Sequence, residues 1–349
     1  MNRVLIIHSS FEVYGGAELA IVKLAQSLLK KNINVTILTT MLPEKVSEEL
    51  KGCFAVVTNN WNELKKWLDI NYQRFDIINS HNNPSQLLLY PNKWKHVWYC
   101  NEPPESVLHN NYLRPEEKML CNESINRIIV ADKFNQERIK KFYDMDSTIV
   151  PYGTDYDFWI QGEGKRAEEY YNLKPNDFVV VHPGWFNPFK NQLRTLDAIE
   201  KLKDKISNLK IVFSGCSNSP YYFEVVNQIN KRNLNKYIVI ETELGRFKLR
   251  DLYARANLVI FPYGHQGGFL SVFDSLCLNK NIIVFPTTSC ANIIKDNNLG
   301  IVSDKLEEFI LNSYNNPNII NENLSKWVKE NMTWENYCEG VYKIFEELI

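Results

Sequence analysis

The sequence predicts an α/β protein built from two doubly wound parallel sheets. Short apolar runs rich in valine and isoleucine alternate with amphipathic helical segments along most of the 349 residues, which is typical of parallel strands joined by helical crossovers. The alternation pauses once, in the charged and glycine-containing stretch at 152–175, and then restarts with a second series of similar size. With 44% hydrophobic residues, the chain can bury two cores.

Each half begins with an apolar strand. The first strand is expected at 3–8, and the helix at 17–31 places Leu24 and Leu28 on an apolar stripe with Lys23 outside it. Further strands of the first half are expected at 34–40, 75–81, 95–100, 127–131 and 147–151. Strands of the second half are expected at 177–184, 209–215, 236–242, 257–262 and 281–286. The predicted domains span 1–155 and 156–330, and a helical segment follows at 331–349.

Composition argues against several classes of protein. Lys and Arg total 40 against 41 Asp and Glu, and this balance argues against nucleic acid as a partner. No apolar run approaches the roughly 18 residues of a membrane-spanning helix, and the first residues read as a strand rather than a signal peptide. The seven scattered cysteines indicate free thiols in a reducing cytoplasm. The six histidines lack metal-ligand spacing, so no metal is expected.

Two turns carry residues that suit an anionic ligand. Gly15 and Gly16 lie between the first strand and the first helix, where free backbone N–H groups attract anions; the alternative is a simple turn. Gly184 ends the first strand of the second half, and Lys190 precedes a helix expected to begin near Asn191. A cation at that position opposes the helix dipole, and an anionic ligand would remove the conflict. The alternative for Lys190 is a solvated surface lysine.

A third turn follows the next strand. Gly215 ends the run "IVFSG", and Leu244 lies after the strand that comes next along the chain. Ligands of open parallel sheets bind beyond the carboxyl ends of the strands. We therefore expect Gly215 and Leu244 to border a nucleobase.

A fourth turn precedes a helix that contains a carboxylate. Asp274 lies within this helix, and a carboxylate is a natural acceptor for the paired hydroxyls of a ribose. The alternative is an exposed helix residue, although its apolar neighbours argue against full solvation. The backbone positions expected to approach an anionic ligand are Gly267, Gly268, Phe269, Leu270 and Ser271.

The order of these motifs resembles the GT-B glycosyltransferases, in particular the retaining glycosyltransferase family 4. "GGAE" is similar to the family's N-terminal glycine motif, and "IVPYGTDYDFW" resembles the segment at its domain junction. "LRDLYARANLVIFPY" and "QGGFLSVFDSLCLNKNIIV" resemble two later motifs. The resemblance covers nearly the whole chain. It implies two Rossmann-like domains facing a central cleft, with the acceptor side at 1–155, the nucleotide-sugar donor side at 156–330, and a helix at 331–349 that crosses back.

The resemblance also implies roles for particular residues. In the family, an arginine and a lysine neutralise the donor diphosphate, two glutamates contact the donor, and a histidine lies near the reacting sugar. The lysine corresponds to Lys190, the first glutamate to Gln266, the second to Asp274 and the histidine to Asn101. These matches imply catalytic roles for Lys190, Gln266 and Asn101, and a donor-binding role for Asp274.

One positive charge of the family is missing. The arginine position falls on Trp185, which removes a bidentate contact to phosphate. Arg194 and Arg246 are the candidates to replace it. Trp185 itself is expected to line the donor site together with Gly184.

The implied activity is transfer of a sugar from a UDP- or GDP-sugar to a glycan or lipid-linked saccharide, with retention of configuration, in surface polysaccharide or glycoconjugate synthesis. No cofactor is implied besides the nucleotide-sugar co-substrate. The expected location is the cytoplasm, and basic and aromatic residues at 61–67 and 133–143 add the hypothesis of peripheral contact with the inner membrane face. Two alternatives stay open: a non-catalytic GT-B protein that binds nucleotide or glycan or supports a partner enzyme, and a GT-B enzyme of another class, such as a sugar-nucleotide epimerase.

Overall fold

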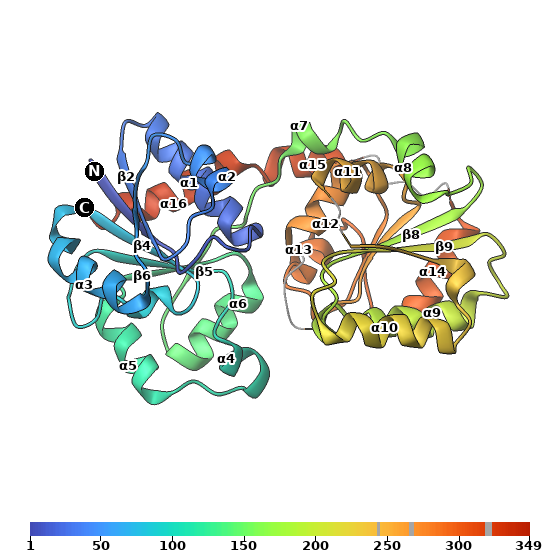
Figure 1. Cartoon of the computed structure of the whole chain (residues 1–349), viewed down its shortest axis with the longest axis horizontal. Coiled ribbons are helices and arrows are strands. Elements are labelled where there is room, and N and C mark those ends of the chain that lie inside the picture. Colours follow the sequence, from blue (N-terminus) through green and yellow to red (C-terminus); the bar gives the residue numbers. More distant parts are fainter. Residues whose placement is uncertain (243–244, 265–268, 318–322) are drawn as a thin grey trace. The chain divides into compact units, whose positions relative to one another are not determined.

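The computed structural model describes residues 1–242, 245–264, 269–317 and 323–349. The chain divides into two compact units: the first unit is Met1–Gly153 with Trp334–Ile349, and the second unit is Thr154–Thr333. Each unit contains one parallel sheet, which confirms the predicted fold class (Figure 1). Within the described ranges, no helix is both long and apolar enough to cross a membrane.

The first unit is built on a seven-stranded sheet of order β3-β2-β1-β4-β5-β6-β7, in which all neighbouring strands are parallel. Its strands are β1 (Arg3–Ile7), β2 (Asn34–Thr39), β3 (Phe54–Val57), β4 (Ile77–His81), β5 (His96–Cys100), β6 (Arg127–Val130) and β7 (Thr148–Ile149). Its α-helices are α1 (Gly16–Lys30), α2 (Glu44–Glu49), α3 (Trp61–Asn71), α4 (Glu105–Asn110), α5 (Pro115–Ser124), α6 (Lys133–Arg138) and α16 (Trp334–Glu346).

The second unit is built on a six-stranded parallel sheet of order β10-β9-β8-β11-β12-β13. Its strands are β8 (Phe178–Pro183), β9 (Leu209–Ser214), β10 (Ile238–Glu241), β11 (Leu258–Phe261), β12 (Ile282–Val284) and β13 (Ile301–Val302). Its α-helices are α7 (Tyr156–Trp159), α8 (Gly164–Tyr171), α9 (Gln192–Leu202), α10 (Pro220–Lys231), α11 (Arg246–Arg255), α12 (Phe269–Leu276), α13 (Ala291–Asp296), α14 (Leu306–Asn315) and α15 (Leu324–Asn331).

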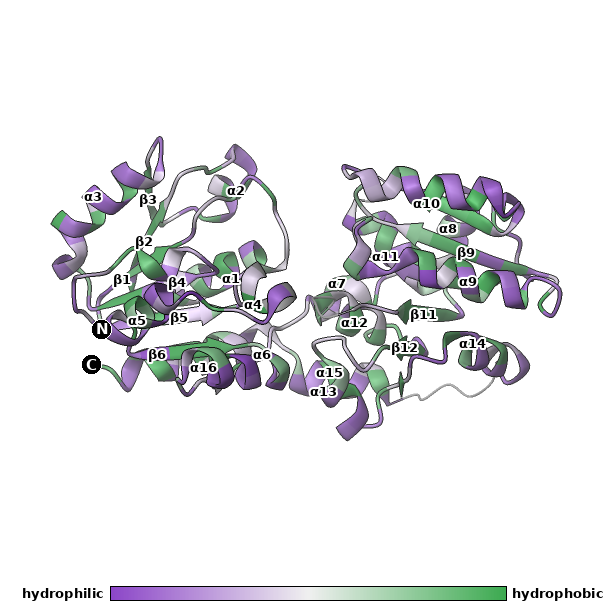
Figure 2. Ribbon diagram, turned by 90° about the horizontal axis from the view of Figure 1, so that it is seen from below, coloured by the Kyte–Doolittle hydropathy of each residue, from purple (hydrophilic) through white to green (hydrophobic). Residues whose placement is uncertain are grey.

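Helices cover both faces of each sheet, as a parallel sheet requires. In the first unit, α3 packs Leu64 and Leu68 against Leu5 and Ile78 of the sheet, while α1 and α16 lie together on the opposite face (Figure 1). In the second unit, α9, α10 and α14 share one apolar cluster with β8, β9 and β11. Figure 2 shows the result: the strands are hydrophobic, and the helices turn hydrophilic residues outward.

In each sheet, the chain adds strands first on one side of a central strand and then on the other. This reversal point is where ligands of such sheets bind. In the first unit, β1 pairs with β2 on one side and with β4 on the other. In the second unit, β8 pairs with β9 and with β11. The two crossovers that leave such a pair of strands run in opposite directions, which opens a crevice at the carboxyl ends. The loops after β1 and β4, and after β8 and β11, are therefore the places to look for a site.

Candidate functional site

The loop after β8 is held by contacts that only glycine permits. Gly184 has φ +129°, in the region that favours glycine, and a Cβ atom there would lie 2.8 Å from the hydroxyl oxygen of Tyr263. A Cβ atom on Gly215, after β9, would lie 2.1 Å from the carbonyl oxygen of Gly184. The ends of β8 and β9 therefore approach each other backbone to backbone, and the predicted turns at Gly184 and Gly215 are neighbours.

Lys190 lies in the short 3₁₀ turn Pro188–Lys190, directly before α9. Its backbone N–H is capped by the Asn187 side chain at 3.0 Å, and its carbonyl accepts a hydrogen bond from His182 Nε2 at 2.9 Å. The ammonium group lies 4.0 Å from the centroid of the Tyr263 ring, which is a cation–π distance. Tyr263 follows β11, so Lys190 reaches across the reversal point of the sheet.

His182 fixes the turn that carries Lys190. Burial lowers the pKa of His182 to about 3, so the ring is neutral. A carbonyl oxygen can only accept, so Nε2 carries the hydrogen, and Nδ1 must accept from the Thr195 hydroxyl at 2.9 Å. The histidine thus links β8, the Lys190 turn and α9 through one tautomer.

Trp185 occupies the position next to this turn. Its side chain is 52% exposed, and its backbone carbonyl accepts a hydrogen bond from Gln192 Nε2 at 2.9 Å. An indole ring supplies a flat apolar surface and one N–H donor but no charge. The charge at this turn therefore comes from Lys190.

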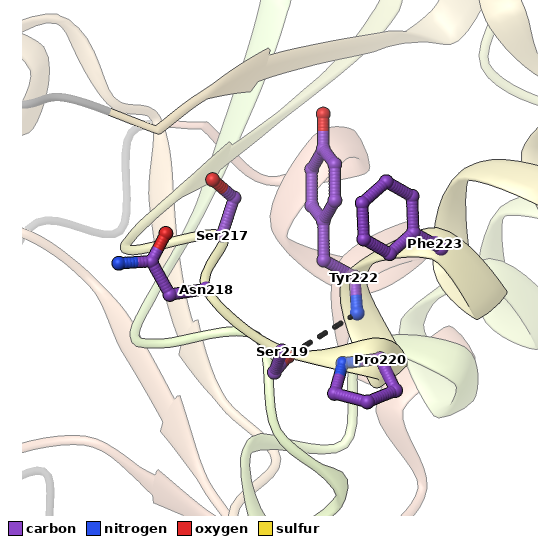
Figure 3. A pocket seen from close by; sticks show the side chains of 6 residues that line it. All are labelled: Ser217, Asn218, Ser219, Pro220, Tyr222 and Phe223. Carbon is purple, nitrogen blue, oxygen red and sulfur yellow. Dashed lines mark hydrogen bonds between the residues drawn. The ribbon is translucent and has the colours of Figure 1, made fainter.

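The loop between β9 and α10 borders an open hollow of about 510 Å³. Ser219 caps α10 by accepting from the backbone N–H of Tyr222 at 3.3 Å, and its hydroxyl donates to the carbonyl of Phe186 in the loop after β8. Figure 3 shows the rings of Tyr222 and Phe223 beside Ser217, on the helix that follows Ser219. The hollow is lined by Ser217, Asn218, Ser219, Pro220, Tyr222 and Phe223.

α12 follows β11 and carries the predicted ribose-binding carboxylate. The described part of the helix runs from Phe269 to Leu276 and includes Leu270 and Ser271. Asp274 is half-buried, and its Oδ1 accepts a hydrogen bond from Thr154 Oγ1 at 2.5 Å. Burial raises the pKa of the Asp274 carboxyl to about 7, although Thr154 and the charge of Arg246 act to lower it. Asp274 is therefore not a freely exposed residue.

In the first unit, the Gly15–Gly16 turn already carries a protein carboxylate. Gly15 is the N-cap of α1, and its backbone N–H donates to Glu18 Oε2 at 2.8 Å. Glu18 Oε1 lies 2.9 Å from His8 Nε2, at the end of β1. Burial acts to raise the pKa of Glu18, but the hydrogen bond and charge of His8 together with backbone hydrogen bonds lower it overall. Part of the anion-attracting capacity of this turn is thus used within the chain.

Asn101 follows β5 at the carboxyl edge of the same sheet. Its amide group donates to the side-chain oxygen of Asn82, and its backbone carbonyl accepts from Asn135 Nδ2 at 3.1 Å. The Asn101 side-chain oxygen is buried and has no hydrogen-bond partner among the described residues. His81, at the end of β4, stacks on Tyr99 with ring centroids 5.3 Å apart. A hydroxyl group could donate to the Asn101 oxygen.

Four predicted site residues lie outside the described residues: Leu244, Gln266, Gly267 and Gly268. Of the others, the second unit brings Gly184, Trp185, Lys190 and Gly215 together and places Asp274 on the helix after β11. In the part of the chain that the structure describes, no group of three or more His, Cys, Asp or Glu side chains could hold a metal ion.

Sequence reasoning missed the partners of the predicted residues. Tyr263 lies under Lys190, Thr154 donates to Asp274, and Glu18 occupies the Gly15 amide. One feature of the sequence could have pointed to Tyr263: it directly follows Pro262 at the end of a buried strand, where site residues are expected. No feature of the sequence pointed to Thr154, since it is 120 residues from Asp274 in sequence.

These features define the class of protein. Two parallel sheets with polar loops at both reversal points form the GT-B fold of glycosyltransferases. HepE of Anabaena, in a crystal structure with UDP, superposes with a TM-score of 0.81 at 14% identity, covering 99% of this chain and 100% of that one. A glycosyltransferase of Rickettsia africae ESF-5 superposes with a TM-score of 0.79 at 15% identity, covering 99% of this chain and 98% of that one.

The family follows from the sequence match. The sequence model of the family "Glycosyl transferases group 1" matches residues 165–343, just over half of the chain. The chain belongs to this family, which confirms the resemblance. A putative glycosyltransferase of Bacillus subtilis (strain 168), EpsD, is 38% identical over 140 residues, which cover 40% of this chain and 36% of that protein.

Proposed function

We propose that this protein transfers a hexose from a UDP- or GDP-sugar to a glycan or lipid-linked saccharide, with retention of configuration, in the synthesis of a surface polysaccharide or glycoconjugate. The observation that carries the proposal is the Lys190 ammonium, held 4.0 Å from the Tyr263 ring centroid at the reversal point of a parallel sheet. The similarity to EpsD supports a role in polysaccharide synthesis, and the fold shared with UDP-bound HepE supports a nucleotide-sugar donor.

In the proposed reaction, the bond between the anomeric carbon and the phosphate oxygen breaks, and the acceptor hydroxyl oxygen bonds to that carbon. The leaving diphosphate takes the hydroxyl proton. Lys190 and the amides at the start of α12 stabilise the charge that develops on the diphosphate. Asp274 holds the ribose, and Asn101 accepts a hydrogen bond from a sugar hydroxyl.

With a lipid-linked acceptor, the protein would act in the cytoplasm at the inner membrane face. The tryptophans of the segment at 61–67 do not support direct insertion there, because Trp61 and Trp67 pack against the core cluster beneath α3. Contact with a membrane would therefore depend on other residues or on the acceptor itself.

The test is a transfer assay with purified protein, a panel of UDP- and GDP-hexoses, and saccharide or lipid-linked acceptors. We expect acceptor-dependent release of one nucleoside diphosphate, a product with the donor's anomeric configuration by NMR, and strong loss of turnover in Lys190→Ala. Nucleotide binding without any turnover across the panel would contradict the proposal and favour the non-catalytic alternative. An inverted product would contradict retention.

A further inference from the structure

The donor site of the second unit has one fewer positive charge than its family. Lys190 supplies a single ammonium, and the position of the family's arginine holds Trp185, whose indole carries no charge. Negative charge grows on a diphosphate as the sugar departs, so fixed cations near it contribute directly to the rate. A second cation from another element would restore the pair.

Arg194 is unsuited to this role. Its Nη2 lies 2.5 Å from Glu307 Oε2 and donates to the carbonyl oxygen of Asp304 at 3.1 Å. Both partners belong to α14 and the turn before it, and α9 packs against α14 in the apolar cluster of the sheet. The other carboxylate oxygen of Glu307, Oε1, lies 2.5 Å from Lys201 Nζ. Arg194 Nη1 is buried without a hydrogen-bond partner among the described residues, but the two contacts of Nη2 hold the Arg194 guanidinium against α14.

Arg246 is placed differently. It is the first residue of α11, directly beyond the loop after β10, and its side chain is 50% exposed. Its Nη2 lies 2.6 Å from Asp155 Oδ2, and its guanidinium carbon lies 4.6 Å from the centroid of the Phe158 ring. The guanidinium carbon also lies 5.6 Å from the centroid of the Trp159 ring. One ion pair and two ring faces therefore hold this half-exposed guanidinium.

Asp155 brings Arg246 next to the helix that carries the predicted ribose contact. The neighbouring residue, Thr154, donates to Asp274 Oδ1 at 2.5 Å. Burial raises the pKa of Asp274, and the positive charge of Arg246 acts against that rise, which is the effect of a nearby cation. Asp274 and the first-turn amides at Leu270 lie on the same helix, separated by about 6 Å along its axis. An arginine side chain can span that separation.

The local charge at the start of α11 also favours an anion. The first turn of this helix contains no acidic residue and begins with Arg246. A cation at a helix N-terminus adds to the positive end of the dipole, which is unfavourable unless an anion lies close by. Asp155 is one such anion, and its Oδ2 accepts from Arg246 Nη2 at 2.6 Å.

We infer that Arg246 contacts the diphosphate of a nucleoside diphosphate donor and supplies the second positive charge that the family takes from the position of Trp185. This inference rests on the proposed function. The groups that Arg246 contacts are the diphosphate oxygens, rather than the ribose or the base. Asp155 and Phe158 act as positioning residues that hold the guanidinium beside Asp274.

The test compares three ligands on one variant. Calorimetry would measure the affinities of UDP and GDP, then of the monophosphate and the nucleoside of whichever base binds, for wild type and Arg246→Gln. We expect the diphosphate affinity to fall about tenfold and the nucleoside affinity to change less than twofold. The wild-type diphosphate affinity should also fall more steeply with salt than that of the variant, because a half-exposed charge pair is screened.

Two further variants make the result specific. Lys248→Gln removes an exposed cation from the same helix, whose ammonium lies 5.6 Å from the Tyr170 ring, and should leave all three affinities unchanged. Arg246→Lys keeps the charge and should recover most of the diphosphate affinity. Unchanged diphosphate binding in Arg246→Gln, an equal loss for the nucleoside, or equal losses in the Gln and Lys variants would overturn the inference. If the wild type binds neither UDP nor GDP, the proposed function itself fails, and this is seen before any variant is measured.

Discussion

The Lys190 ammonium lies 4.0 Å from the centroid of the Tyr263 ring, although the two residues are 73 positions apart in sequence. Tyr263 is buried, and its hydroxyl donates to the carbonyl oxygen of Pro183 at the end of β8. The ring therefore joins β8 and β11 and presents its face to the lysine. This arrangement holds Lys190, the only charged side chain of the turn at 184–191, in position even without a bound ligand.

The first prediction concerns the ring itself. Tyr263→Leu should weaken nucleoside diphosphate binding severalfold, because a cation–π contact of this kind contributes about 0.5–2 kcal/mol. Tyr263→Phe keeps the ring face and should bind like wild type, while losing about 1 kcal/mol of unfolding free energy with the hydrogen bond to Pro183. Calorimetry and chemical denaturation would separate the two effects. Equal loss of affinity in both variants would show that the hydroxyl, and not the ring face, matters.

The second prediction concerns the glycine contact between β8 and β9. Gly215→Ala should lower the free energy of unfolding by about 1–3 kcal/mol, because its methyl group would overlap the carbonyl oxygen of Gly184 at 2.1 Å. Nucleotide affinity should fall as well, since the Gly184 turn must move. Gly264→Ala is the matched control, because a Cβ atom there meets nothing within 4 Å. Chemical denaturation of both variants would measure this, and a Gly215→Ala protein as stable as Gly264→Ala would be inconsistent with the contact.

The third prediction concerns the pH dependence of stability. Asp274 ionises near pH 4 in the unfolded chain, and burial raises its pKa to about 7 in the folded one. Between these values the folded state binds an extra proton, so the free energy of unfolding should fall as pH rises from 4 to 7, by at most about 4 kcal/mol from this group. Asp274→Asn cannot lose a proton and should be less sensitive over that interval.

Chemical denaturation at pH 5 and pH 8 would test this. Asp132 is a second buried carboxyl with a pKa raised to about 7 by burial, and it stays in both proteins, so only part of the slope should disappear. An identical fall in stability for wild type and Asp274→Asn would mean that Asp274 ionises normally in the folded protein.

The sequence was enough to predict the two sheets, because the alternation of apolar runs and amphipathic helices is local information. It was also enough to place Gly184 and Gly215 at strand ends and Lys190 just before a helix. It could not show that Gly184 and Gly215 touch, since that contact depends on which strands are neighbours. Likewise, Arg194 and Arg246 were equivalent candidates in sequence, and only their partners Glu307 and Asp155 distinguish them.

The measurement that tests the central claim most directly is calorimetric binding of UDP and of GDP to wild type, Lys190→Ala and the exposed-lysine control Lys205→Ala. We predict that one nucleotide binds the wild type and the control equally, and binds Lys190→Ala at least tenfold more weakly, a loss of about 1.4 kcal/mol. Failure of the wild type to bind either nucleotide, or equal affinities in Lys190→Ala and wild type, would contradict a donor site at Lys190.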